Sequence, residues 1–165
     1  MSEFADRDAF IRAMRGVAAS VTVVTTKGAA GKFGATVSSF CSVSADPPMV
    51  LVCLNAASRI AKEVEKNGRF CVNILPHGAT ALADRFAGRD DDVLTNRFTD
   101  VQLQDEDGVG LAGATVLRCS IDSVQRAATH LVCIGNVDEV VGASEDPLTW
   151  YDGAYHRVIP LRRAS

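Results

Sequence analysis

Residues 34–55, GATVSSFCSVSADPPMVLVCLN, constrain the fold more than any other part of the sequence. The stretch begins with small and hydroxyl side chains, passes through Asp46-Pro47-Pro48 and ends in an apolar run at 49–54. The apolar run is typical of a buried strand, and the prolines interrupt any strand ladder because they have no N–H to donate. Short hydroxyls beside such a strand suit a polar ligand, because backbone can approach closely there. A half-exposed Ser/Thr-rich strand and turn has the same composition, so both interpretations stay open.

The rest of the chain predicts further strands with hairpin-like spacing. β-branched or alternating apolar runs indicate strands at 21–26, 49–54, 69–75, 114–124 and 129–141. Turn formers at 27–32 predict a hairpin that leads into the hydroxyl-rich stretch. Gly135 is a candidate β-bulge. Near the C-terminus, Asp152-Gly153 predicts a turn among three aromatic residues.

Short helices are expected between these strands. Apolar residues at helical spacing predict helices at 6–17, 58–66 and 80–87, and residues 90–98 form a polar, partly helical segment. Ser58 caps the second helix and Asn67-Gly68 ends it. Residues 100–113 are loop-like. Because helices and strands do not alternate strictly, we expect a mainly β, antiparallel barrel of about six strands with short peripheral helices.

Composition narrows the class of protein. The 165 residues suffice for a single domain over 1–165, and the net charge of −3 argues against nucleic acid as a partner. No apolar run is long enough to span a membrane, and the acidic start of the chain resembles neither a signal nor a transit peptide. The five cysteines are scattered without a C-x-x-C pair. We therefore expect a reduced, cytoplasmic protein without a zinc site.

The common catalytic and nucleotide-binding motifs are absent from the sequence. There is no G-x-S-x-G, H-E-x-x-H, P-loop or G-x-G-x-x-G, and His77, His130 and His156 have no metal-ligand spacing. We expect no metal. A flavin-dependent hydride transfer needs none of these motifs, because the cofactor carries the reaction and the protein supplies position and electrostatics.

Five segments together resemble the short flavin reductase family. They are GVAASVTVVTT at 16–26, the whole 34–55 stretch, ADRFAG at 83–88, THLVCIGNV at 129–137 and PLTWYDGAYHRV at 147–158. The segments occur in order over nearly the whole chain, and the 34–55 stretch is the specific one. The resemblance is to the reductase components of two-component flavin monooxygenases of the 4-hydroxyphenylacetate 3-monooxygenase type. It implies a Greek-key split β-barrel and a homodimer with flavin near the subunit interface.

The resemblance also assigns the residues of the flavin site. The start of the 34–55 stretch would line the flavin, and residues 53–55 would read the ring edge through their backbone. Ser58 and Arg59 open a helix whose N-terminus suits a phosphate, and a plain N-cap role for Ser58 is compatible with this. The expected cofactor-binding residues are Ala35, Thr36, Val37, Ser38, Ser39, Cys53, Leu54, Asn55, Ser58, Arg59, Phe86, Arg89 and Tyr155.

Two of these cofactor-binding residues, and the expected catalytic residue, have a simpler alternative role. Arg89 would add positive charge near the phosphate, or it is a solvated surface arginine. Tyr155 would close over the flavin, or it packs in the core. His130 is the expected catalytic residue, beside the nicotinamide, or it is a structural histidine at a strand edge. Its triplet Ala128-Thr129-His130 resembles the Thr-His form of the family's Gly-Asp-His, with Ala128 in place of the usual glycine.

The resemblance implies an NAD(P)H:flavin oxidoreductase that passes hydride from NADH or NADPH to FMN or FAD. The reduced flavin would serve a partner monooxygenase or be used in place. A second possibility within the family is reduction of a corrinoid or of ferric iron. From another class, the alternative is a non-enzymatic flavin-binding redox module. The sequence does not distinguish FMN from FAD or NADH from NADPH.

Overall fold

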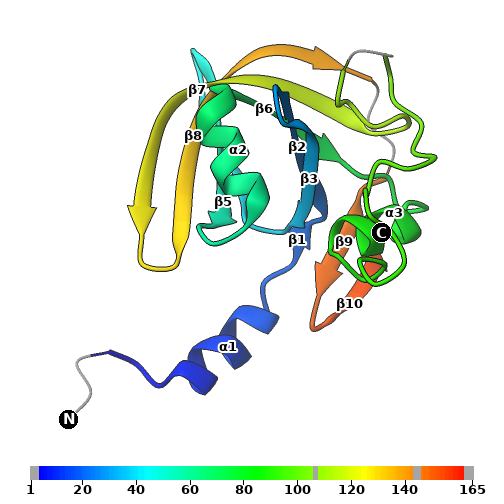
Figure 1. Ribbon diagram of the computed structural model, residues 1–165. Helices are drawn as coiled ribbons and strands as arrows, with labels where there is room; N and C mark the ends of the chain where they lie inside the picture. Colours follow the sequence, from blue (N-terminus) through cyan, green and yellow to red (C-terminus); the bar gives the residue numbers. More distant parts are fainter. Residues whose placement is uncertain (1–3, 106–107, 143–145, 162–165) are drawn as a thin grey trace.

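The computed structural model describes residues 4–105, 108–142 and 146–161, and its strands form two antiparallel sheets. The larger sheet has the order β3-β2-β6-β7-β8-β5-β4, and the smaller has the order β1-β9-β10. The strands are β1 (Ala19–Ser20), β2 (Thr22–Gly28), β3 (Gly31–Val37), β4 (Phe40–Ala45), β5 (Pro48–Asn55), β6 (Arg69–Ile74), β7 (Thr115–Ala127), β8 (His130–Val141), β9 (Leu148–Tyr151) and β10 (Ala154–Arg157). The helices are α1 (Arg7–Arg15), α2 (Arg59–Asn67) and α3 (Thr80–Phe86). Figure 1 shows the larger sheet curving around α2.

The predicted mainly β, antiparallel architecture is confirmed, and the larger sheet has seven strands where the sequence predicted about six. The strands without an apolar signal of their own are β3 and β4, because they consist mostly of glycine, serine and other small residues. They belong to the hydroxyl-rich stretch, which is therefore half-exposed strand. Asp46 and Pro47 form the turn between β4 and β5, and Pro48 already pairs with Ala45.

The prediction of a bulge at Gly135 is wrong in its position. The β7–β8 pairing shifts at two other residues: Asp122 is the extra residue on β7, next to the Ile121–Gly135 pair, and Asp138 is the extra residue on β8. Gly135 pairs regularly, and a Cβ added to it would lie 2.7 Å from Cζ of Phe70. Glycine is needed here because the ring of Phe70 fills this part of the barrel.

Helix α2 packs against β2, β3, β5 and β6 and covers the barrel core. Its apolar inner face includes Ile60, Ala61 and Val64, and all three are buried. The helix begins at the N-cap Ser58 and ends at Gly68, which has the left-handed φ of 65° that favours glycine. These two ends fix α2 against the barrel.

Buried polar groups connect the 100–113 loop to the barrel. The side chain of Asn73 donates to the carbonyl of Val23 (2.8 Å) and accepts from the amide of Leu111 (2.7 Å). Thr25 donates its hydroxyl to the carbonyl of Val109 (2.7 Å). These hydrogen bonds fix residues 109–111, and the described part of the loop is largely irregular, as predicted.

Helix α1 was predicted correctly, but none of its residues is buried. It projects away from the barrel (Figure 1). It is attached near Arg15, whose Nε lies 2.9 Å from Oδ1 of Asp152 and whose carbonyl accepts from the Asp152 amide. Phe10 is 60% exposed and Met14 48% exposed. No helix in the described parts of the chain combines the length and apolar character that crossing a membrane requires.

Candidate functional site

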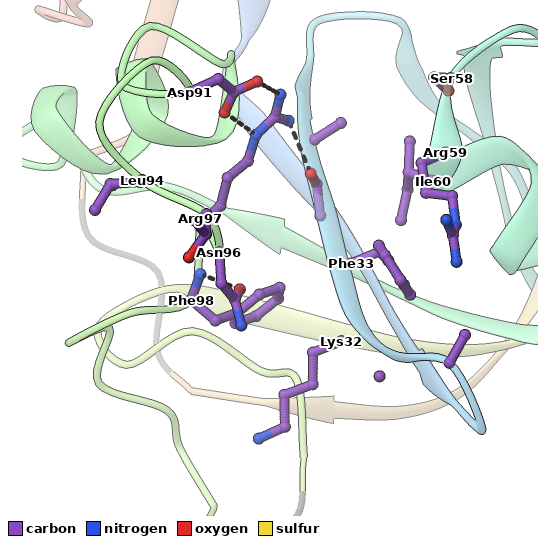
Figure 2. A pocket seen from close by; sticks show the side chains of 15 residues that line it. Lys32, Phe33, Ser58, Arg59, Ile60, Asp91, Leu94, Asn96, Arg97 and Phe98 are labelled. Atoms are coloured by element: carbon purple, nitrogen blue, oxygen red, sulfur yellow. Dashed lines mark hydrogen bonds and ion pairs between the residues drawn. The ribbon is translucent and has the colours of Figure 1, made fainter.

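Two hollows in the surface share β3. The larger one, called the groove below, has a volume of about 820 Å³ and is formed by residues 30–35, 58–60, 91 and 94–98. Figure 2 shows β3 as its floor, with the start of α2 on one side and the 91–98 segment on the other. The smaller one, called the hollow, has a volume of about 270 Å³ and lies where β3 ends, beside Ala87 and Arg89, which follow α3, and beside residues of β9 and β10.

Arg97 holds the 91–98 wall of the groove in place. Its Nε and Nη2 donate to the two carboxylate oxygens of Asp91 (2.8 and 2.6 Å), and these hydrogen bonds hold the pKa of Asp91 below its usual value. Its Nη1 donates to the carbonyls of Gly34 (3.1 Å) and Phe86 (2.9 Å). The expected partial helix in this segment is wrong, because residues 91–98 form turns and bends.

The opposite wall of the groove is the first turn of α2. The hydroxyl of Ser58 accepts from the amide of Ala61 (3.3 Å), which confirms the predicted cap. The guanidinium of Arg59 lies 4.8 Å from the ring centre of Phe33, and its Nε donates to Oε1 of Glu63 (2.9 Å). Burial of Glu63 opposes its charge, but hydrogen bonds from Arg59 and Lys66 outweigh this and lower its pKa. Arg59 is thus fixed at its base while 63% of its side chain stays exposed.

Asp84 of α3 contacts two of the residues that line the hollow. Tyr155 donates its hydroxyl to Oδ1 of Asp84 (2.7 Å), and Nε of Arg89 lies 3.3 Å from the same oxygen. Burial and the hydrogen bond to Asp84 raise the pKa of Tyr155 to about 12. Trp150 contacts the Tyr155 ring edge-on at 5.1 Å between centroids. Tyr155 and Arg89 therefore line one cavity, and Arg89 is ion-paired.

Most of the sequence-predicted residues gather around β3. Ala35, Ser58 and Arg59 line the groove. The hollow is lined by Thr36, Val37, Ser38, Arg89 and Tyr155. The groove and the hollow adjoin along β3, because Ala35 faces one and Thr36 the other. Their geometry suits a long, flat ligand with a negatively charged end, because small side chains lie beside aromatic rings and guanidinium groups.

The expectation that Phe86 contacts the cofactor is wrong. Its side chain is fully buried, so it is not placed to contact a ligand. It packs so closely on β3 that a Cβ on Gly34 would lie 2.6 Å from its Cε1. The inner face of α3 is directed into the core, and Phe86 shapes the site only from below. The side chain of Leu54 is also buried, but the prediction for this residue concerned only its backbone.

The other predicted residues line neither the groove nor the hollow. The Cys53 amide donates to the carbonyl of Ser39 (3.0 Å), so these two lie side by side. His130 is exposed at the start of β8 and pairs with Asn55 across the sheet. Its Nδ1 lies 2.9 Å from the hydroxyl of Thr129. Ala128 takes the left-handed conformation, with φ of 49°, where the family usually has glycine.

Several groove residues were not anticipated from the sequence. Arg97, Asn96 and Phe98 belong to a segment with no motif, and their role follows only from its position against β3. Among residues 4–105, 108–142 and 146–161, no three His, Cys, Asp or Glu side chains are grouped so as to hold a metal ion.

Comparison with known proteins gives a consistent result. A family model described as a flavin reductase like domain matches residues 14–158. The chain is 33% identical to the 4-hydroxyphenylacetate 3-monooxygenase reductase component of Pseudomonas aeruginosa, with 100% of both chains covered. It is 36% identical to a flavin reductase (NADH) of Kitasatospora aureofaciens, over 92% of this chain and 82% of that one. A solved NADH:FAD oxidoreductase of Streptomyces globisporus, in complex with NAD and FAD fragments, superposes with a TM-score of 0.83 and 27% identity, over 96% of this chain and 98% of that one.

Proposed function

This chain belongs to the flavin reductase-like domain family, and we propose that it is an NADH-dependent flavin reductase whose flavin lies along β3. The observation that carries the proposal is the convergence at the end of β3. There, residues 36–38 meet Arg89, Trp150 and Tyr155, which come from distant parts of the sequence. A bound flavin would supply the acceptor for the hydride of NADH, and the residues along β3 would hold it.

The residues of the hollow would bind and orient the flavin ring. Thr36 donates its hydroxyl to the carbonyl of Ala83 (2.7 Å), which fixes the end of β3 against α3. Tyr155 is held by Asp84, so its ring is a rigid wall. Fixed walls lower the entropic cost of aligning two reacting rings, which is the main contribution a protein can make to this reaction.

The start of α2 would bind the flavin phosphate. Ser58 is its N-cap, and the first-turn amides and the helix dipole favour an anion at this end. Arg59 adds a positive charge whose position is fixed by Glu63 and Phe33. His130 would contact the nicotinamide dinucleotide from the strand next to Asn55.

The exposed apolar face of α1 supports a homodimer. An isolated helix of nine residues is only marginally stable in water, so Phe10 and Met14 need a surface that covers them. We expect that surface to be on a second copy of the chain. Light scattering should then give the Met14→Glu variant about half the mass of the wild type. An equal mass for both would contradict a role of α1 in the dimer.

The partner of the reduced flavin would be a monooxygenase, in line with the reductase component that the chain resembles. All five cysteines are free thiols, which supports the expectation of a reducing, cytoplasmic compartment.

Anaerobic mixing of protein, NADH and free FAD or FMN tests the function. We expect flavin bleaching and NADH oxidation in equal amounts, dependent on protein. The Arg89→Gln variant should raise the flavin Kd, whereas the control Arg69→Gln, at an exposed arginine outside the groove and hollow, should not. Flavin binding without NADH oxidation would indicate a binding module, and absence of both would refute the proposal.

A further inference from the structure

The turn between β7 and β8 holds an alanine in a backbone conformation that favours glycine. Ala127 and His130 form the last pair of the two strands, so Ala128 and Thr129 make up the turn. Ala128 has a φ of 49°. A residue with a side chain keeps such a conformation only where the surrounding structure holds it, and such strain is concentrated at functional sites. Figure 1 shows this turn in yellow, at the free end of the long β7–β8 hairpin.

Hydrogen bonds tie the turn to the start of α2. The carbonyl of Thr129 accepts from the amide of Ala56 (2.9 Å), and His130 pairs with Asn55 across the sheet. The carbonyl of Asn55 accepts from the Ser58 hydroxyl (2.6 Å) and from the Ser58 amide (2.9 Å). The backbone of His130 is therefore fixed relative to the N-cap of α2, where the flavin phosphate is expected.

The side chain of Thr129 restricts what the backbone leaves free, which is the rotation of the His130 ring. His130 is exposed, so packing alone does not hold its imidazole. Oγ1 of Thr129 lies 2.9 Å from its Nδ1. A hydroxyl both donates and accepts, so it can pair with either tautomer of the neutral ring. In residues 4–105, 108–142 and 146–161 no other group is hydrogen-bonded to this ring, so Nε2 is the nitrogen left for a ligand.

From these contacts, and resting on the proposed function, we propose that Thr129 is a positioning residue whose hydroxyl holds the imidazole of His130 with Nε2 directed toward the nicotinamide dinucleotide. Thr129 acts through His130 and does not itself contact the substrate. A ring that is oriented before NADH binds does not have to be ordered at that step, which preserves affinity. It also holds the dinucleotide in one orientation for hydride transfer. The alternative is that the hydroxyl serves only the turn.

Two substitutions separate the hydroxyl of Thr129 from the rest of its side chain. Thr129→Val keeps the branched shape and removes the hydroxyl, whereas Thr129→Ser keeps the hydroxyl and removes a methyl group. Ser123→Ala is the matched control, because Ser123 is an exposed serine on β7 whose side chain has no hydrogen-bond partner in the described part of the chain. Thermal melting checks that every variant is folded.

The first measurement needs neither flavin nor NADH. Nitrogen NMR spectra of imidazole rings report hydrogen bonds to each ring nitrogen, and the chain has only three histidines, so the His130 signals are assigned by their loss in His130→Ala. The Nδ1 signal of His130 should show a hydrogen bond in wild type, Thr129→Ser and Ser123→Ala, and should lose it in Thr129→Val. Identical spectra for wild type and Thr129→Val would overturn the inference.

The second measurement is stopped-flow flavin reduction at increasing NADH concentration. Thr129→Val should raise the apparent Kd for NADH by about two- to tenfold, the equivalent of one hydrogen bond, with the flavin Kd and the Tm unchanged. Thr129→Ser and Ser123→Ala should stay close to wild type. In a His130→Ala background, Thr129→Val should have no further effect, because the two residues act as one unit.

Three results would assign the Thr129 hydroxyl to the turn and overturn the inference, while leaving the flavin reductase function standing. They are an unchanged NADH Kd in Thr129→Val, an equal loss in Thr129→Ser, and an equal effect of Thr129→Val with and without His130. Absence of NADH oxidation by the wild type in the presence of flavin would refute the proposed function and the inference together.

Discussion

The hydroxyl of Tyr155 ties β10 to α3, and removing it should change stability in a pH-dependent way. Tyr155→Phe deletes the hydrogen bond to Oδ1 of Asp84 (2.7 Å). A hydrogen bond to a charged group contributes about 1.5–3 kcal/mol. The Asp84 side chain is 31% exposed and keeps Arg89 as a partner at 3.3 Å, so we expect a loss of about 1–2 kcal/mol. For a domain of this size that corresponds to a Tm lower by about 2–8 °C.

The pH dependence follows from the raised pKa of Tyr155. Burial and the hydrogen bond to Asp84 raise it to about 12 in the folded protein, whereas an unfolded tyrosine titrates near about 10. The protonated form therefore stabilises the fold, fully below pH about 10, and this contribution is lost as the pH rises toward 12.

The assay is thermal unfolding of wild type and Tyr155→Phe at pH 8 and pH 11. The Tm difference between them should be largest at pH 8 and should shrink at pH 11. Tyr151→Phe, in the neighbouring strand β9, is the control for the loss of a hydroxyl and should show a smaller difference at pH 8. A Tm difference for Tyr155→Phe that is equal at both pH values would refute the reasoning.

Three further predictions concern the core and the dinucleotide site. Asn73→Leu should lower the free energy of unfolding by about 3 kcal/mol in urea titrations, because the Val23 carbonyl and Leu111 amide lose their buried partner. Gly135→Ala should cost about 1–3 kcal/mol by overpacking against Phe70, whereas Gly78→Ala, with open space around it, should cost less than 1 kcal/mol. His130→Asn should raise the KM for NADH or slow hydride transfer in stopped-flow measurements, with flavin Kd unchanged. Unchanged kinetics with a lower Tm would make His130 structural.

Local signals predicted those elements whose ends are fixed by nearby residues. The Asp152-Gly153 turn is an example, because both residues have positive φ (47° and 81°) and this pair of residue types tolerates that conformation in a tight hairpin. The ends of α2 are another, since Ser58 and Gly68 act on amides and carbonyls within a few residues. In both cases the information lies within one turn of chain.

Phe86 shows a conflict between two kinds of sequence evidence. The helical spacing of apolar residues predicted an amphipathic helix at 80–87, which puts Phe86 on an apolar face, whereas the family resemblance made Phe86 a cofactor contact. The structure agrees with the periodicity, since Phe86 is fully buried. A side chain on the inner face of an amphipathic helix is committed to the core, and only its neighbours at the helix end, such as Arg89, can reach a ligand.

The contact of Arg97 with β3 could not be predicted from the sequence. It is 63 residues from Gly34, whose carbonyl accepts its Nη1, and nothing in the turn-rich segment around it marks it as different from other surface arginines. The size and lining of the groove depend on this long-range contact. Residue patterns report the period of an element and its ends, but they do not report which irregular segment lies against which strand edge.

The apolar face of helix α1 raises the same question for contacts between two chains. Its spacing predicted an amphipathic helix, and an amphipathic helix requires a surface that covers its apolar face. In the described residues that face remains exposed, with Phe10 at 60% and Met14 at 48%. The pattern thus predicted an apolar face on α1 but not the surface that covers it. If a second copy covers α1, the helix gains the burial that its short length cannot replace, and dimer formation and helix formation become one equilibrium.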